Sequence, residues 1–571
     1  MKINLSVMSL IALTGAAITG CVQDEYDLSD VDTTTRLSVN DLTIPVNMDA
    51  VTLKTIIKPD ADSKIKEIEV DFKKIYALQA DGNFSSDAIK VNGFTTSSPN
   101  PQTASTTLVN LNVPGLPAGH FRYDIQEMAP RSFNYTYSGV DKSIISVEAL
   151  GLEKNTFRVK FGFTGVPSSL AKSIKVTDLV IEMPAHLIGA VPSAGRYAAE
   201  TGLWTIDSYE INNSVSGALS LSFSGVEFTE NPIDANHNFT YSTQMRIRGG
   251  LMDLATDGGM AQITGIGLTA DYTVDALKAT TFTGVVEYNI DDLNVSPIEL
   301  SDLPDFLTGA GTNIKIADPE ILLAINNPVA RYGLEYQTGL TLTAIRGGVR
   351  GESYSLNDPN YFTVKATTLE QMFDIKPAST PLRPGYTAVG FDALSNVLSG
   401  QGLPNSIAID LVDPKVPRQR VQAFELGKAL ERVTGKYEIY APLELGDGSV
   451  VVYSDKETGW NDEDVDAITI TKLSLTATVK NNTSLDVVLA AYPLGTDQKR
   501  IPGVEITSNL VKAGAEQQIE IEMTGTVTHL DGIEYVATVT ATGDQKVLSP
   551  DDTIELTDIR AKASGYYEKE L

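Results

Sequence analysis

The sequence predicts an all-β protein made of several tandem β-sandwich domains with few short helices. The chain has 571 residues, which is too long for one hydrophobic core and suggests several domains of ~100–200 residues each. Apolar and polar residues alternate in many short stretches, as they do in strands with one buried and one solvated face. Turn signals such as Gly446-Asp447-Gly448 separate many of these stretches.

The alternation predicts individual strands along the whole chain. In each stretch an apolar residue occupies every second position and polar residues fill the gaps. The clearest stretches are Ile68–Phe72, Phe157–Phe163, Leu219–Phe223, Leu268–Val274, Ile407–Leu411 and Ile519–Met523. Further turns are predicted at Asp81-Gly82, Asp257-Gly258-Gly259 and Asp531-Gly532.

Helical signals are few. The best is Val416–Val433, which carries a rough apolar stripe and is followed by Gly435, a residue type that ends helices. We expect this segment to be a linker helix between the last two domains. Residues 303–307 and 394–398 are expected to form single helical turns.

One internal repeat occurs in the second half of the chain. A Tyr-x-Ile segment, a Pro-x-Glu-Leu segment and a strand ending in an Asn pair occur twice, reaching Asn326-Asn327 and Asn481-Asn482. Paired Asn residues tolerate a left-handed backbone and suit the turn after a strand. Two similar modules are therefore expected, and the strand with its Asn turn resembles immunoglobulin-like envelope modules.

These signals give a domain plan. A signal peptide is expected at residues 1–20, an acidic tether at 21–40, and four β domains after it. The β domains are placed at 41–147, 148–292, 293–432 and 433–571, and the third ends in the linker helix.

Composition limits the function classes. Lys+Arg 44 against Asp+Glu 73 gives a net charge of −29. Such a charge repels nucleic acid, so no nucleic-acid partner is expected. The chain has one cysteine, Cys21, which excludes an intramolecular disulfide and a zinc site built from several cysteines.

The N-terminus has the pattern of a lipoprotein signal. Lys2 precedes an uncharged, mainly apolar stretch that ends in Ile18-Thr19-Gly20-Cys21. That ending resembles a lipobox, in which small residues admit the peptidase and the cysteine thiol receives the lipid. The apolar stretch is short for a membrane span of ~20 residues. We therefore expect cleavage before Cys21 and a membrane anchor on that cysteine.

The residues after Cys21 resemble those of surface lipoproteins of Bacteroidota. Asp24-Glu25 is similar to their surface-export signal, and the tract Tyr26–Thr34 resembles the opening of a group of uncharacterised lipoproteins from that phylum. The resemblance covers about the first 50 residues. It implies an outer-membrane location facing outward and brings no known activity. The alternative is a solvated tether whose acids keep it extended.

Motifs for catalysis are missing from the sequence. It contains no His-Glu-x-x-His, no Gly-x-Ser-x-Gly and no phosphate-binding Gly-x-x-x-x-Gly-Lys motif. The four histidines lie far apart in the sequence. A paired-carboxylate hydrolase stays open as the weakest alternative, because facing acids are a property of the fold. We expect no enzyme and no cofactor.

Two weak ligand signals remain. The acidic run containing Asp462, Asp464 and Asp466 has oxygen ligands suited to calcium, although a solvated loop explains it equally simply. Trp204 and Trp460 lie near predicted turns, where an exposed indole can stack on a sugar. The alternative for each is packing in a sandwich core.

The functional expectation is a lipid-anchored protein of the outer membrane, exposed on the cell surface. It would act as a non-catalytic binding, adhesion or assembly component with a glycan or protein ligand. The alternative is a structural lipoprotein that faces the periplasm.

Overall fold

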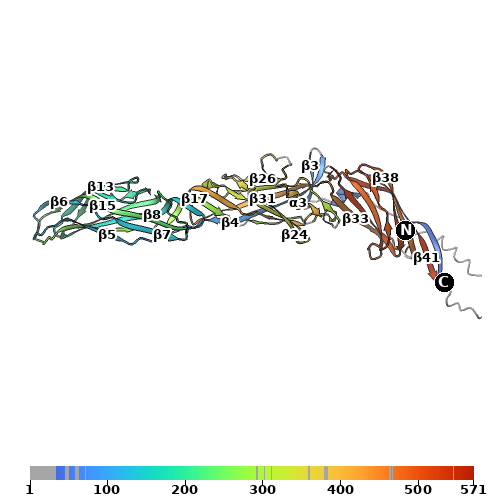
Figure 1. The fold of residues 1–571 in the computed structure, drawn as a ribbon, viewed down its shortest axis with the longest axis horizontal. Coiled ribbons are helices and arrows are strands. Elements are labelled where there is room, and N and C mark those ends of the chain that lie inside the picture. The colour runs from blue at the N-terminus through green and yellow to red at the C-terminus, as the bar shows by residue number, and fades with distance from the viewer. Residues whose placement is uncertain are drawn as a thin grey trace, which may run out of the picture. The chain divides into compact units, whose positions relative to one another are not determined.

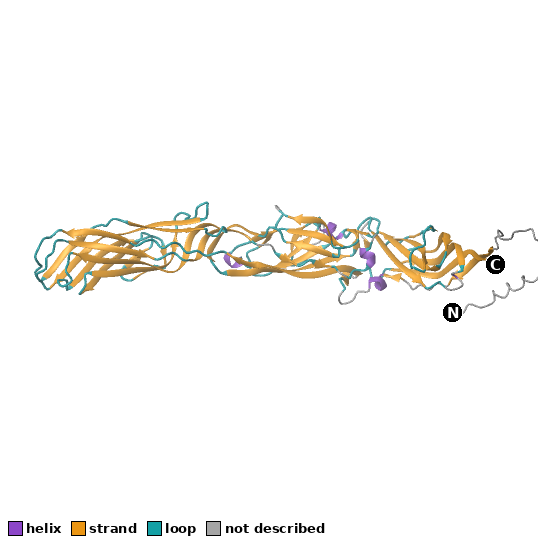
Figure 2. Ribbon diagram, turned by 90° about the horizontal axis from the view of Figure 1, so that it is seen from below, coloured by secondary structure: helices purple, strands orange, loops and turns teal. Residues whose placement is uncertain are grey.

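The chain folds almost entirely into β-strands, as the sequence predicts (Figures 1 and 2). The computed structural model describes residues 34–44, 51–57, 63–70, 73–290, 293–300, 302–309, 311–357, 360–378, 383–461, 465, 467–543 and 546–570. Its helices are short: α1 (Leu53–Ile57), α2 (Asp305–Thr308), the 3-10 turn η3 (Ala330–Tyr332) and α3 (Leu394–Leu398). In the described part, no helix is long and apolar enough to cross a membrane.

The chain divides into two compact units that are not contiguous in sequence. Unit 1 comprises residues 1–51, 453–539 and 553–571, and unit 2 comprises residues 52–452 and 540–552. Unit 2 is thus inserted into unit 1 along the chain. The predicted plan of consecutive domains needs correction, because unit 1 is built from three separate stretches of the chain. Two of the predicted boundaries, near 147 and 432, also fall inside strands β8 (Ile144–Thr164) and β31 (Ala429–Pro442).

Unit 1 is a sandwich of two antiparallel sheets. One has the strand order β1-β41-β34-β38-β36, and in the other β33, β39, β35 and β37 are successive neighbours. The bounds are β1 (Thr34–Ile44), β41 (Thr553–Glu570), β34 (Ile468–Asn481), β38 (Glu516–Val527), β36 (Glu505–Ile506), β33 (Val450–Thr458), β39 (Leu530–Thr540), β35 (Asp486–Gly495) and β37 (Asn509–Val511). The alternating Ile519, Ile521 and Met523 face its core, as predicted.

The first strand corrects the tether prediction. Residues 34–40, expected in the tether, belong to β1, which pairs with β41 so that Thr34 lies opposite Glu570 and Ile44 opposite Ala561. In Figure 1 this is the blue strand beside the red β41. Alternation did not reveal the strand because β1 has no buried apolar face: Leu37 is exposed, and Ile44 at the end of the strand is its one buried residue.

Unit 2 contains one sandwich made of the two sheets that include β8 and β15. In the first sheet the strands are β10 (Leu187–Ile188), β11 (Val191–Pro192), β14 (Ser216–Glu227), β8, β16 (Ile266–Val274), β5 (Gln102–Val109), β17 (Ala279–Asn289), β30 (Lys415–Glu425), β22 (Tyr336–Thr338) and β25 (Phe362–Val364). In the second they are β12 (Arg196–Ala198), β13 (Leu203–Asn212), β9 (Ser173–Glu182), β15 (Asn238–Thr256), β6 (Gly119–Ile125) and β7 (Arg131–Ser138). The rings of Phe161 and Tyr209 meet between the sheets at 5.6 Å.

Two further sheets of unit 2 surround β21 and β29. The larger has the order β18-β4-β31-β21-β26-β27 with β3 beside β4, and the smaller has the order β19-β29-β23-β24. Their bounds are β18 (Asn294–Val295), β4 (Lys73–Lys90), β21 (Glu320–Ile325), β26 (Gln371–Lys376), β27 (Thr387–Gly390), β3 (Ile65–Val70), β19 (Ile298–Glu299), β29 (Ser406–Asp410), β23 (Leu340–Arg346) and β24 (Val349–Leu356). The remaining short strands are β2 (Val51–Thr52), β20 (Asn313–Ile314), β28 (Gly400–Gln401), β32 (Glu444–Leu445) and β40 (Lys546–Val547).

The predicted linker helix is wrong. Residues 416–433 form most of β30 and the start of β31, joined by a turn at Gly427. The pairing of β30 with β17 shifts register between Phe282 and Gly284, which displaces Val421 and Phe424 from strict alternation. Bulges of this kind give apolar residues a spacing that imitates a helix. The helical turns expected at 303–307 and 394–398 are present as α2 and α3.

Two predicted turns are strand interiors. Asp81-Gly82 lies within β4 and Asp531-Gly532 within β39, whereas the turn at Gly446–Gly448 is present and Asp257–Gly259 lies in the loop after β15. A Cβ at Gly82 would lie 2.2 Å from the Tyr437 hydroxyl, and one at Gly532 would lie 1.9 Å from a backbone oxygen. These glycines are in strands because a neighbour passes too close for any side chain.

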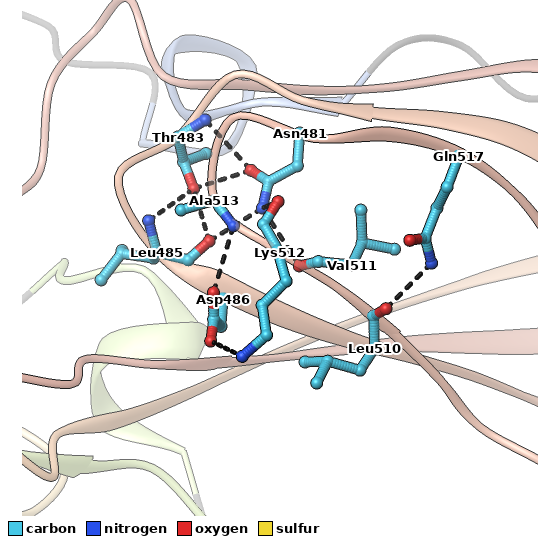
Figure 3. A network of polar contacts seen from close by, with 9 residues as sticks. All are labelled: Asn481, Thr483, Leu485, Asp486, Leu510, Val511, Lys512, Ala513 and Gln517. Atoms are coloured by element: carbon cyan, nitrogen blue, oxygen red, sulfur yellow. Dashed lines mark hydrogen bonds and ion pairs between the residues drawn. The ribbon is translucent and has the colours of Figure 1, made fainter.

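The two Asn pairs close their strands by side-chain hydrogen bonds. Asn481 is fully buried, and its Nδ2 donates to the carbonyl oxygens of Leu485 at 2.8 Å and Lys512 at 3.2 Å. Its Oδ1 accepts from the backbone N–H of Thr483 at 3.0 Å. Figure 3 shows this network together with the neighbouring Asp486–Lys512 ion pair.

The first copy of the repeat makes corresponding contacts. Asn327 is buried, donates to the carbonyl oxygens of Leu334 at 2.8 Å and Lys365 at 2.9 Å, and accepts from the Val329 N–H at 3.0 Å. Neither Asn pair has a left-handed backbone. The expected reason for the Asn pairs was therefore wrong: the buried amide satisfies backbone groups that the turn leaves without partners.

Candidate functional site

Several predicted site residues lie outside the described residues. These are Cys21, Asp24 and Glu25 at the N-terminus and Asp462, Asp464 and Asp466 in the acidic run. Within the described part, no group of three or more His, Cys, Asp or Glu side chains is arranged to hold a metal ion. The calcium prediction therefore rests on the sequence alone.

Both tryptophans belong to cores, which corrects their prediction as ligand contacts. Trp204 is 0% exposed, and its indole N–H donates to the carbonyl oxygen of Ala194 at 2.7 Å. Trp460 is 9% exposed and packs in the core of unit 1 with residues such as Leu530. A sugar cannot reach either ring face, because sandwich edges bury large aromatic rings.

The histidines have structural positions. His186, His237 and His529 have φ values of 61°, 56° and 54°. Histidine is one of the few side chains that enters this left-handed region with some frequency. His120 is exposed on β6, where its Nδ1 lies 2.9 Å from Oδ1 of Asp253. The four residues are thus accounted for by turns and a surface contact.

An open depression in unit 2 gathers carboxylates. It has a volume of about 570 Å³ and is lined by Leu293, Val295, Ser296, Thr341 and residues 410–413, which include Asp410 and Asp413. The hydroxyl of Tyr361 donates to the Asp413 carboxylate at 3.1 Å. The lining combines two acids with aliphatic groups and includes no histidine or basic side chain.

The most distinctive surface lies on the ribbon formed by β7 and the first half of β15. Asn238 lies opposite Ser138, Thr240 opposite Thr136, Ser242 opposite Asn134 and Gln244 opposite Ser132. These outward side chains are exposed or half-exposed. We call them the neutral face: Ser132, Asn134, Thr136, Ser138, Asn238, Thr240, Ser242 and Gln244. Every one carries a hydroxyl or an amide and none carries a charge.

The opposite side of the same ribbon is aromatic. Phe133, Tyr135 and Tyr137 alternate on β7, and Phe239 and Tyr241 alternate on β15. Ring contacts, with centroids 5.1–5.9 Å apart, run continuously through Tyr137, Phe94, Phe239, Phe228, Tyr241 and Tyr135. This aromatic layer fixes the ribbon against the rest of the sandwich, since stacked and edge-on ring pairs favour defined geometries.

One group in the aromatic layer has an unusual environment. Tyr135 is 0% exposed, and its hydroxyl has no hydrogen-bond partner in the described structure. Burial raises the pKa of Tyr135 strongly, and the nearby Tyr241 and Asp275 raise it further. The phenol is therefore neutral at any ordinary pH, and it adds no charge beneath the neutral face.

The neutral face was missed in the sequence, although a signal existed. Residues 91–121, 132–140 and 235–245 contain no Asp, Glu, Lys or Arg in a chain that is 20% charged. The fold joins the three segments, because β7 pairs with β15 and the Ser97 N–H donates to the carbonyl oxygen of Thr136 at 3.0 Å. Mapping runs without charge, rather than searching for tryptophan, would have located this surface.

Comparisons with known proteins identify no family. The chain matches no protein-family model and no curated protein. A solved "putative secreted protein" of Parabacteroides distasonis ATCC 8503 is similar over 50% of this chain and 90% of that chain, with 14% identity and a TM-score of 0.35. A chain from the atomic structure of Sulfolobus Turreted Icosahedral Virus covers 82% of this chain and 91% of its own length, with 11% identity and a TM-score of 0.11. These values are too low to transfer any property.

Proposed function

We propose that this protein is a lipid-anchored component of the cell envelope that binds a glycan or a protein and performs no catalysis. Its anchor is the lipid on Cys21, and its place is the outer surface of the outer membrane. Asp24 and Glu25 act as the export signal. The β-sandwich units carry the surface that binds the partner.

One observation about unit 1 supports this proposal most directly. In the β1–β41 pair, Thr34 and Glu570 lie at one end of the ladder and Ile44 and Ala561 lie toward the other. The chain comes from Cys21 at the first end. It leaves unit 1 after residue 51, re-enters it for residues 453–539 and enters it again at Thr553; the exit after β1 and the entry at Thr553 both lie toward the second end of the ladder. An anchored chain would therefore enter the β1–β41 ladder at one end and leave it at the other.

That path suits a spacer that carries another unit. The segment 22–33 links Cys21 to β1 in the sequence. β1 pairs with β41, and β41 pairs in turn with β34. A lipid anchor alone tethers a chain without specifying what it binds. Unit 2, with residues 52–452 and 540–552, holds most of the chain, and we place the surface for the partner there.

Protease shaving of intact cells tests the location. Three forms are compared: the wild type, Cys21→Ala, and a double substitution of Asp24 and Glu25 by Asn and Gln. We expect cleavage of the wild type and protection of the double variant, with lipid labelling lost only in Cys21→Ala. Lipid labelling of Cys21→Ala at the wild-type level would refute the anchor. Protection of the wild type in intact cells would refute surface exposure and favour a structural lipoprotein facing the periplasm.

A further inference from the structure

The neutral face has a charge pattern that differs from the rest of the molecule. The protein carries 73 acidic and 44 basic residues, yet both strands of the ribbon present only hydroxyl and amide groups outward over their paired length. The side chains also bond across the ribbon, where the Ser242 hydroxyl donates to Oδ1 of Asn134 at 2.8 Å. A solvated face of an ordinary acidic domain would carry charges among these positions.

The neutral face continues beyond the ribbon. The hydroxyls of Ser97 and Thr136 lie 3.1 Å apart, so the uncharged loop before β5 borders β7. This loop adds the exposed residues Ser97, Ser98 and Asn100, which carry the same kinds of polar group. Thr103 donates to the carboxylate of Asp271 at 2.6 Å, which marks where charge returns.

Charges at the two ends of the ribbon are paired locally. Beyond Gln244, Arg246 and Arg248 contact Glu182, at 2.6 Å and 3.0 Å respectively. At the other end, the Asp234 carboxylate accepts hydrogen bonds from the backbone N–H and side chain of Asn238 at 2.9 Å and 3.1 Å. Arg131 of β7 shares the alternation of Phe133 and Tyr135, so the outward positions of the ribbon carry no basic side chain and a neutral ligand needs none.

The chemistry of the face matches a neutral polyhydroxylated chain. Each hydroxyl offers one donor and two acceptor positions, and each amide offers both kinds of group, so the surface can exchange hydrogen bonds with sugar hydroxyls in either direction. The aromatic layer beneath holds the ribbon in shape, which lowers the entropy lost on binding.

We propose that the neutral face and the adjoining loop bind an uncharged polysaccharide that lies along the ribbon. This deepens the proposed function by naming the ligand class and the surface. It rests on the proposed binding role, but not on the membrane location. Specificity would come from the order of hydroxyl and amide groups along the strands, because no ionic contact selects the ligand.

The test uses full-length lipoprotein extracted in detergent, applied to immobilised dextran, mannan, laminarin and galactan, with polygalacturonate as the acidic probe. The wild type is expected to bind at least one neutral polysaccharide and to bind polygalacturonate no better than bare support. Thr136→Lys and the double variant with Ser242→Lys should weaken that binding at least tenfold, because each lysine places a hydrated charge on the face. Thr136→Ser should retain it.

Thr557→Lys supplies the matched control, since Thr557 is an exposed strand threonine of unit 1. It should bind like the wild type, and equal denaturation midpoints will show that all variants fold. The proposal is overturned if no neutral polysaccharide binds or if Thr136→Lys binds as well as the wild type. It is also overturned if light scattering shows that the wild type self-associates and that Thr136→Lys abolishes this, because the neutral face would then bind a second copy of the chain. Shaving separates the two proposals: exposed protein without polysaccharide binding refutes only this inference, and protected protein that binds in detergent refutes only the surface location.

Discussion

The ribbon of β7 and β15 in unit 2 and the sheet around β34 in unit 1 present polar faces of different chemistry. Both place hydroxyl side chains at the centre, such as Thr136 in unit 2 and Thr476 in unit 1. In unit 1, Thr476 lies between Glu520 on β38 and Arg560 on β41. On the ribbon, by contrast, the neighbours of Thr136 carry only hydroxyl and amide groups. One face is therefore laced with charges of both signs and the other has none.

The two regions also differ beneath these faces. The inner side of β34 is aliphatic, with Leu473, Leu475 and Val479 buried, and it closes at Asn481, whose amide has partners on both atoms. The inner side of the ribbon is aromatic and includes the Tyr135 hydroxyl without a described partner. The comparison teaches that unit 1 is built for a closed core with a solvated exterior. The ribbon instead has a buried hydroxyl without a described hydrogen-bond partner beneath an outer face without charge.

Breaking the closed end of unit 1 should give the largest effect. Asn481→Ala removes hydrogen bonds from buried carbonyl and N–H groups, and we expect it to lower the free energy of unfolding of unit 1 by about 2–4 kcal/mol. Each unit contains one tryptophan, so fluorescence can follow them separately: Trp460 reports on unit 1 and Trp204 on unit 2. In a Trp204→Phe background, denaturation by urea will measure the unit 1 transition alone.

Asn482→Ala is the control for this change. Asn482 is exposed, and its Nδ2 donates to the hydroxyl of Thr553 at 2.9 Å. Its loss should cost less than about 1 kcal/mol, because water replaces an exposed hydrogen bond. Equal losses for Asn481→Ala and Asn482→Ala would mean that burial of the amide does not close the sandwich as described.

Several strands of both units follow from the sequence, but the strands of the ribbon and the chemistry of its outer face do not. Alternation predicts that Phe157 to Phe163 and Ile519 to Met523 lie in strands with one buried side, because a pleated strand sends successive side chains to opposite faces. It fails where the pairing shifts register, as in residues 416–433, and where a glycine marks close packing, as at Gly82. These failures have one cause: the decisive neighbour lies far away in the chain.

The candidate surface was beyond the same reasoning for a related reason. Each of the three segments without charge is an ordinary polar stretch by itself, and only the pairing of β7 with β15 and the contact of Ser97 with Thr136 bring them together. Trp204 and Trp460 misled because turn signals were taken as evidence of exposure, whereas the indoles fill cores. Sequence patterns give an orientation relative to the backbone, and tertiary packing decides what that orientation meets.

A buried acid in unit 2 tests how the fold treats charge placed inside. Asp552 is 9% exposed, and burial raises its pKa to about 6 from 3.8. Because the folded pKa exceeds the unfolded one, this group lowers the free energy of unfolding as pH rises from about 4 to about 6, by roughly 3 kcal/mol in all. Asp552→Asn should remove that loss while keeping an oxygen for the Ser549 N–H, which lies 2.8 Å from Oδ2 of Asp552.

The measurement compares wild type and Asp552→Asn by urea denaturation at pH 4.5, 5.5 and 7.5, followed by Trp204 fluorescence. The variant should be more stable than wild type at pH 7.5, and the advantage should shrink toward pH 4.5. Other acids titrate equally in both proteins, so the difference isolates Asp552. A difference that stays constant with pH would show that Asp552 does not titrate in this range.

The smallest expected effect concerns the unpaired hydroxyl beneath the neutral face. Tyr135→Phe deletes a buried hydroxyl that has no described partner, so it removes a desolvation cost without breaking a hydrogen bond. We expect the free energy of unfolding of unit 2 to rise by up to about 1 kcal/mol. Tyr197→Phe gives the matched contrast, because the Tyr197 hydroxyl donates to the carbonyl oxygen of Pro184 at 2.5 Å. That variant should lose about 1 kcal/mol. Both are measured by Trp204 fluorescence in a Trp460→Phe background. If the two substitutions change stability in the same direction, the Tyr135 hydroxyl has a partner in solution, and the contrast drawn here between the undersides of the two faces is wrong.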